Sequence, residues 1–358
     1  MRLQDLDDRA EPNGWIDTAV ERLQELDADL IKAGWTRDER TGAHWWSLTY
    51  RRPEPPGHPQ RSTMMRKATM TTHGSRSVLV WTTAISALVT VASVLGLMDE
   101  GVYAKETENW ASQARGQDIG NLFAVVTLWI SGYRHHNGSH RAGLVWLGTL
   151  LYLVYAYTVY SMAVHFNQLF LVYVAALGLS AYAVMLTVPG LRADNEEFPQ
   201  PTARAFAGYT SIAIGVMFGA LWLSELIPAT LSGDVPQSVE DAGLWVNPIH
   251  VIDLAVLLPA FTLAGYLTLR RQPTGAFFVA PLLTFSVLMG ASIVAAMVVM
   301  AVGGFDNTLP PLVMVSLVVL LSVLAAWRYL AGSYASSATR QGESALEGED
   351  TLQEHPAT

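Results

Sequence analysis

The sequence predicts an all-α transmembrane protein: a bundle of about eight helices, with both ends in the cytoplasm and a small N-terminal cytoplasmic α+β unit. Only 15% of the 358 residues are charged and 51% are hydrophobic, whereas a soluble chain carries about a quarter charged residues. Apolar segments long enough to cross a bilayer recur from residue 77 onward. Lys and Arg collect on alternate connections between these segments, which fixes the expected orientation.

The composition excludes several classes of site. The chain has no cysteine, which excludes disulfides, thiolate metal ligands and cysteine nucleophiles. A formal net charge of −9 leaves no broad basic face, so we expect no nucleic-acid partner. The first residues, MRLQDLDDRAEPNGW, lack an apolar core, so we expect no cleavable signal peptide and insertion through the first true span.

Residues 1–52 are expected to form a small cytoplasmic helix-plus-hairpin unit. Apolar residues recur at near-helical spacing from Ile16 to Ile31, and Gly34 favours the end of a helix. The following WTRDERTGAHWWSLTYRR predicts two short strands around a Thr-Gly turn. A Pro- and Arg-rich linker at 53–76 is expected to be extended and semi-rigid.

Eight segments between this linker and the C-terminal tail qualify as membrane spans, because a helix needs about 20 apolar residues to cross the hydrocarbon core. The second is short and is extended by RGQDIGNLF at its outer end. The bundle occupies residues 77–332, and the acidic tail at 333–358 is expected to be disordered. The spans lie near 77–98, 119–133, 142–164, 167–189, 204–228, 249–269, 275–302 and 309–331.

Basic residues alternate from one side of these spans to the other. Twelve of the 22 Lys and Arg precede the first span, and the connections after the second, fourth, sixth and eighth spans hold all but two of the rest. The opposite side holds only Lys105 and Arg115. Because Lys and Arg favour cytoplasmic loops, we expect a multi-pass protein of the cell (cytoplasmic) membrane with both ends inside.

Ionisable side chains at membrane depth are costly and therefore mark candidate sites. Here they fall near the outer ends of the expected spans, so converging helix ends would form an extracytoplasmic polar pocket. The candidate ligand-binding residues are Asp253, His250, Glu225, His165, Arg115 and Asp118.

The segment NPIHVIDLAVLLPAF, residues 247–261, carries two of these candidates in its first turns. Asn247 is a good helix N-cap and Pro248 suits the first helical position. A carboxylate is favoured at a helix N-terminus, but Asp253 lies about 9 Å beyond the cap at 1.5 Å per residue. His250 and Asp253 share a helix face at i, i+3. The pair either lines a site or serves capping and packing.

The other candidates have structural alternatives. His165 lies in a tight hairpin between two spans, and Glu225 could extend outward one turn before its span ends. Arg115 and Asp118 could pair with each other or cap a helix, whereas an Arg that faces the pocket would favour an anionic ligand.

Aromatic residues add a second pattern. In the span at 142–164, Tyr152 and Tyr155 share one helix face, and Tyr157 and Tyr160 share another. Buried tyrosines need a partner for the hydroxyl, so one face is expected to look into the bundle. Two long outer loops are acidic, and each contains an aromatic that could rest at the membrane interface, Trp110 and Trp245.

Brought together, His165, Glu225, His250 and Asp253 would suit zinc or another divalent ion. No HExxH, Walker loop, dinucleotide-binding turn or nucleophile elbow accompanies them. The sequence therefore leaves metal, cofactor and catalytic residues open.

The stretches ARGQD, HFNQLF and NPIHVIDLA, with LWLSELIPATLSGDVPQSVEDAG, resemble an uncharacterised family of prokaryotic polytopic membrane proteins. The resemblance covers roughly residues 94–330 and leaves the N-terminal unit outside. It implies a bacterial or archaeal cytoplasmic membrane, but no substrate, reaction or cofactor.

Three functions remain open at this point. The first is a transporter or receptor-like protein whose outward-facing pocket binds a small polar or ionic ligand. The second is a membrane-embedded, metal-assisted enzyme that acts on lipid or lipid-linked substrates at the outer leaflet, with Asp253 or Glu225 as general base. The third is a sensor or assembly protein whose N-terminal unit binds a partner. Membrane lipid is the expected surrounding partner, and oligomeric state is open.

Overall fold

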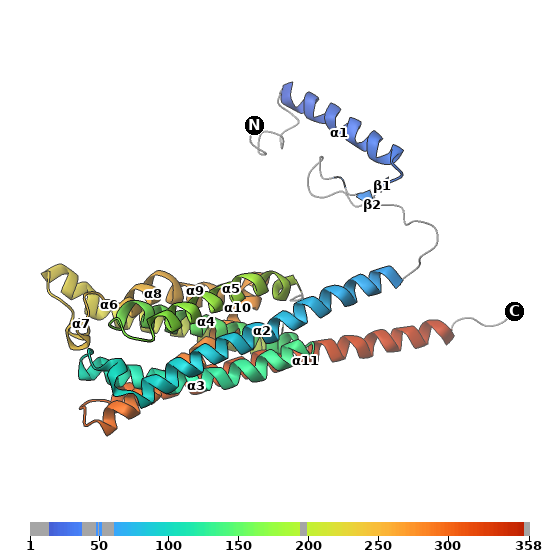
Figure 1. Ribbon diagram of the computed structural model, residues 1–358. Helices are drawn as coiled ribbons and strands as arrows, with labels where there is room; N and C mark the ends of the chain where they lie inside the picture. Colours follow the sequence, from blue (N-terminus) through green and yellow to red (C-terminus); the bar gives the residue numbers. More distant parts are fainter. Residues whose placement is uncertain (1–13, 38–47, 49, 52–60, 194–198, 354–358) are drawn as a thin grey trace. The chain divides into compact units, whose positions relative to one another are not determined.

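The computed structural model describes residues 14–37, 48, 50–51, 61–193 and 199–353, and the chain divides into two units, 1–71 and 72–358 (Figure 1). In the first unit, helix α1 (Gly14–Lys32) is followed by two antiparallel strands, β1 (Thr36–Arg37) and β2 (Tyr50–Arg51). Asp27 of α1 accepts a hydrogen bond from Tyr50 and pairs with Arg37 at 3.3 Å. The expected Thr-Gly turn lies outside the described residues, and the cytoplasmic location of this unit stays a prediction.

Seven helices of the described chain are long and apolar enough to cross a membrane, so the chain is an all-α, multi-pass membrane protein. One of them is a continuous run of α8, the π-helical turn η3 and α9. The seven are α2 (Arg61–Met98), α4 (His140–Ala163), α5 (Phe170–Ala193), α6 (Pro201–Ser232), α8 to α9 (Pro248–Ile252, Asp253–Leu257, Leu258–Leu269), α10 (Pro273–Val302) and α11 (Leu309–Gln353).

The second expected span lies inside helix α3 (Glu108–His136), which is not among the seven. Its buried face carries polar residues, including Asp118 and Asn121, which lower its hydropathy. The helix nevertheless packs against α4 and α10 along its length. The count of eight spans therefore stays a prediction.

Helix α2 begins at Arg61 and α11 ends at Gln353, so both extend into the segments that the sequence analysis assigns to the linker and the tail. Residues 61–76 contain no proline, and the end of α11 is rich in Ala, Glu and Leu, which favour helix. Two short helices complete the bundle unit: the 3₁₀ turn η2 (Glu100–Tyr103) and α7 (Gln237–Ala242).

Helix α10 packs against α3, α4, α9 and α11. The pairing of α6 with α9 is also extensive, because glycines let the two backbones approach closely. A Cβ atom on Gly265 would lie 2.5 Å from the carbonyl oxygen of Gly208, and one on Gly215 would lie 2.3 Å from Thr262 Oγ1. Gly215 and Gly219 are four residues apart on α6, but a Cβ atom on Gly219 would meet open space, so of these two only Gly215 is needed for the close approach.

Large apolar side chains cover much of the outer surface of the helices, including Val80, Phe123, Leu171 and Leu231. In water such a surface would favour aggregation, whereas lipid tails solvate it well. The exposed apolar surface agrees with membrane insertion.

Candidate ligand-binding cavity

The start of the sixth expected span has an irregular helix that sets the position of Asp253. Asn247 Oδ1 accepts the Ile249 N–H at 3.0 Å and Pro248 occupies the first turn, which confirms the predicted helix start. Pro259 has no N–H and its ring would clash with the carbonyl four residues earlier. The chain widens instead into the π turn η3, in which the Leu258 N–H donates to the Asp253 carbonyl.

Asp253 is 7% exposed, and its carboxylate accepts one hydrogen bond of regular geometry; the Tyr155 hydroxyl also faces this carboxylate, without that geometry. Trp222 Nε1 of α6 donates to Asp253 Oδ2 at 2.8 Å. The other oxygen, Oδ1, has no hydrogen-bond partner among the described residues. His250 packs against the Trp222 ring with centroids 4.7 Å apart, so these three residues form one local group.

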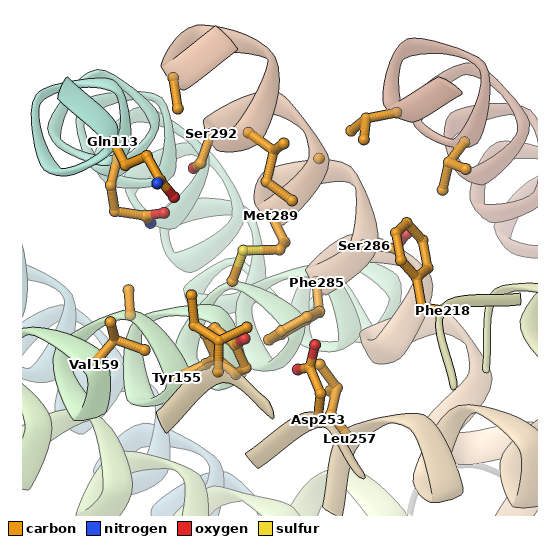
Figure 2. A pocket seen from close by; sticks show the side chains of 18 of the residues that line it. Gln113, Tyr155, Val159, Phe218, Asp253, Leu257, Phe285, Ser286, Met289 and Ser292 are labelled. Atoms are coloured by element: carbon orange, nitrogen blue, oxygen red, sulfur yellow. The ribbon is translucent and has the colours of Figure 1, made fainter. Parts of the chain in front are cut away.

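Asp253 lines a cavity of about 310 Å³ inside the bundle, formed by α3, α4, α6, α8, η3, α9, α10 and α11 (Figure 2). In Figure 2 the Asp253 carboxylate lies beside Tyr155 and Phe285. The walls are mainly apolar and aromatic. Among the described residues that line the cavity, Asp253 is the only carboxylate and there is no Lys, Arg or His. The other polar lining residues are Gln113, Gln117, Tyr155, Tyr160, Trp222, Ser286 and Ser292.

A hydrogen-bonded group joins α3, α4 and α10 at the edge of this cavity. Gln117 Nε2 donates to the Tyr152 hydroxyl at 2.6 Å, and this hydroxyl lies 2.9 Å from Asn121 Oδ1 and 2.6 Å from Ser292 Oγ. Tyr152 and Tyr155 both contact the Phe285 ring edge to face, which confirms that they share an inward-facing side of α4.

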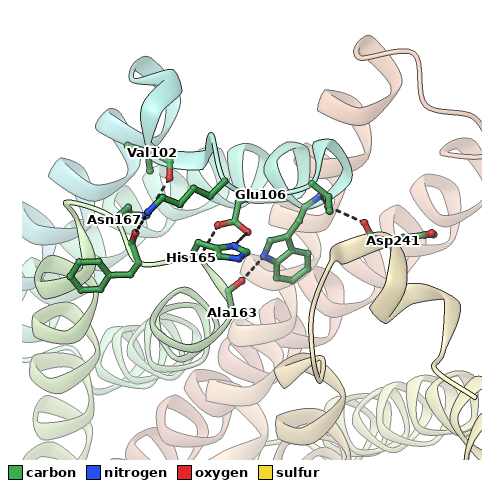
Figure 3. A network of polar contacts seen from close by, with 10 residues as sticks. Val102, Glu106, Ala163, His165, Asn167 and Asp241 are labelled. Carbon is green, nitrogen blue, oxygen red and sulfur yellow. Dashed lines mark hydrogen bonds and ion pairs between the residues drawn. The ribbon is translucent and has the colours of Figure 1, made fainter. Parts of the chain in front are cut away.

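Glu225 and His165 lie outside the cavity. Glu225 Oε1 accepts the Ser238 N–H at 3.1 Å and so caps the first turn of α7. His165 is exposed and is held by Glu106, which accepts its backbone N–H at 2.7 Å and contacts its imidazole at 3.0 Å (Figure 3). Both residues therefore stabilise connections at the end of the bundle.

Arg115 and Asp118 do not pair. Asp118 is 1% exposed and accepts hydrogen bonds from Tyr103 at 2.6 Å and from Tyr160 at 2.9 Å. Burial first, and then the Asp118 charge, raise the pKa of Tyr103 well above its usual value, so this hydroxyl stays protonated and can donate. Arg115 is half-buried, does not line the cavity, and has no hydrogen bond or ion pair among the described residues.

No group of three or more His, Asp or Glu side chains in the described part of the chain could hold a metal ion. His165, Glu225, His250 and Asp253 are thus not gathered as a ligand set. The partners of His165 and Glu225 named above account for this separation.

Two tryptophans contribute to the cavity in ways that the sequence does not predict. Trp222 holds Asp253 from the neighbouring helix, and no sequence pattern links the two residues. Trp110 is 5% exposed, lines the cavity and donates from Nε1 to the Ala163 carbonyl at 2.8 Å. Its indole is therefore packed inside the bundle, and its position relative to the membrane interface stays a prediction.

In three comparisons, the chain matches no protein-family model, no curated protein and no solved structure. The functional conclusion therefore rests on the geometry of the cavity.

Proposed function

We propose that this integral membrane protein binds a small organic cation with an apolar body in the cavity, and that Asp253 Oδ1 accepts the hydrogen bond of its charged group. The observation that carries this proposal is the unpartnered Oδ1 atom of a buried carboxylate at the wall of an apolar cavity.

The charge of the ligand follows from what surrounds Asp253. A carboxylate in an apolar interior is costly unless it is paired, and one indole N–H does not neutralise it. The lining offers no basic side chain among the described residues, so an anion would meet only a like charge. A cation supplies both the missing hydrogen bond and the missing positive charge.

The body of the ligand follows from the walls. Tyr155, Phe218, Phe261 and Phe285 contribute aromatic rings to the lining, and the volume of about 310 Å³ lies at the lower end of the range for small-molecule pockets. Aromatic faces also attract cations. An aromatic or branched monoamine has the required shape and charge.

The cavity lies toward the bundle end that carries η2, α7 and the Asn247 helix start. If both chain ends are cytoplasmic, as the Lys and Arg distribution indicates, this end faces outward. Reporter fusions at Lys105, Gly138 and Gly233 test the orientation: an outer signal at Lys105 and Gly233 and a cytoplasmic one at Gly138 are expected. A cytoplasmic signal at Gly233 would contradict an outward-facing pocket.

Binding can be measured by calorimetric titration of the full-length protein in lipid nanodiscs with naphthylethylamine and with its uncharged analogue naphthylethanol. Asp253→Asn keeps the size of the side chain and an oxygen for Trp222, but removes the charge. The variant should lose about 10- to 100-fold in affinity for the amine, the equivalent of a charge-assisted hydrogen bond.

The alcohol is the matched control, because Asp253→Asn should leave its affinity unchanged. Equal affinity of wild type and Asp253→Asn for the amine would contradict the proposal. So would equal losses for amine and alcohol, because these would indicate a general change in the cavity.

A further inference from the structure

A second buried carboxylate lies outside the proposed ligand site. Asp118 of α3 accepts hydrogen bonds from Tyr103 of η2 and Tyr160 of α4, and no described Lys, Arg or His side chain hydrogen-bonds or pairs with it. Helix α2 approaches so closely that a Cβ atom on Gly96 would lie 2.2 Å from Asp118 Oδ2. The negative charge is therefore enclosed by protein, with neutral donors alone.

Three buried hydroxyl groups around this carboxylate have no hydrogen bond of regular geometry among the described residues: Ser93, Tyr157 and Tyr173. The Tyr173 hydroxyl faces Asn167 and Tyr103. The Ser93 hydroxyl faces Asp118, and the Tyr157 hydroxyl faces Ser93, without the geometry of regular hydrogen bonds. The rings of Tyr157, Tyr160 and Tyr173 pack together, with Tyr160 and Tyr173 centroids 5.1 Å apart. We call this group the Asp118 cage: Ser93, Tyr103, Asp118, Tyr157, Tyr160 and Tyr173.

We propose that the Asp118 cage binds one sodium ion. The donors are all oxygen atoms, which hard cations prefer. One carboxylate balances one positive charge, whereas a divalent ion would leave a positive charge buried without compensation. A proton on Asp118 would also remove the charge, but it supplies one donor only, whereas a sodium ion can accept several hydroxyl oxygens as ligands at once.

The cage adjoins the cavity and shares Tyr160 with it. Tyr160 donates to Asp118 and also lines the cavity, whereas Asp118 and Ser93 do not line it. The sodium site is thus independent of Asp253, and its test does not depend on the organic cation.

Radioactive sodium binding to the full-length protein in nanodiscs, measured by scintillation proximity, tests the proposal. Wild type should bind sodium saturably, and unlabelled sodium should displace the label while choline does not. Asp118→Asn should abolish binding, and Ser93→Ala should weaken it at least about tenfold, because it removes one oxygen ligand but keeps the charge. Asp253→Asn should bind sodium as wild type does.

Ser86→Ala is the matched control. Ser86 lies on the same helix as Ser93, is also buried and has an unpartnered hydroxyl, but it is not part of the cage. Its removal should leave sodium binding unchanged.

Two results would overturn the sodium site: the absence of saturable sodium binding in wild type, or equal sodium affinity in Ser93→Ala and wild type. Absence of saturable sodium binding would mean that a proton, and not a sodium ion, neutralises Asp118. If Asp118→Asn does not fold, Ser93→Ala decides the question by itself, because it leaves the carboxylate and both of its tyrosine donors in place.

Discussion

The Trp222–Asp253 hydrogen bond offers a sharp test of whether Asp253 is charged. The two side chains come from different helices, and their 2.8 Å contact is the only direct hydrogen bond to the carboxylate among the described residues. A double-mutant cycle combines Trp222→Phe, which keeps an aromatic ring but removes the N–H, with Asp253→Leu, which removes the acceptor. The cycle isolates the energy of the pair from the separate costs of each substitution.

The expected coupling depends on the charge state. A hydrogen bond to an ionised group contributes about 1.5–3 kcal/mol, whereas hydrogen bonds between helices in a membrane average about 0.6 kcal/mol. The carboxylate of Asp253 is buried, and the Trp222 N–H is the one donor of regular geometry that reaches it among the described residues. We therefore expect a coupling free energy of about 1.5–3 kcal/mol.

Unfolding free energies can be measured for the wild type, both single variants and the double variant by SDS titration in mixed micelles. A coupling at or below about 0.6 kcal/mol would refute the reasoning. It would mean that Asp253 is neutral in the ligand-free protein and has no charge to offer an organic cation. Val256→Ala, an exposed position one turn away, serves as a control that should not couple to Trp222→Phe.

Three further substitutions test the packing. Met289→Trp fills part of the cavity and should reduce calorimetric affinity for naphthylethylamine and naphthylethanol alike; a loss confined to the amine would contradict the assigned volume. Pro259→Ala removes the cause of the π turn but leaves every cavity-lining residue in place. It should lower the affinity for the amine because Asp253 would move. Unchanged affinity would show that the π turn does not set the position of Asp253. Gly96→Ala should lower the unfolding free energy by about 1–3 kcal/mol, because the added Cβ atom would overlap Asp118. Gly178 faces open space, so the control Gly178→Ala should be neutral or stabilising. Equal effects of the two substitutions would contradict the close approach of Gly96 to Asp118.

The membrane class and the choice of Asp253 as a candidate were accessible from the sequence. Long apolar segments predict spanning helices, and seven of the eight expected segments coincide with helices that qualify by length and hydropathy. Asp253 stood out because helix capping by Asn247 and Pro248 does not explain a carboxylate two turns into an apolar segment. The structure agrees: the cap is present, and the carboxylate faces a cavity.

The sequence could not show which polar residues meet. Asp118 and Arg115 are three residues apart, yet Asp118 bonds to tyrosines from other elements. Glu225 and His165 look like pocket residues by depth alone, but Glu225 accepts the Ser238 N–H and His165 donates its own backbone N–H to Glu106. Which side chains form hydrogen bonds with one another depends on how the helices pack, and the hydropathy of the sequence does not predict this packing.

The most direct test of the central claim is a structure of the full-length protein with bound naphthylethylamine. The account predicts the ammonium nitrogen about 2.7–2.9 Å from Asp253 Oδ1, with the naphthyl ring among the aromatic residues of the cavity. An amine bound elsewhere, or one bound in the cavity with its nitrogen turned away from Asp253, would contradict it.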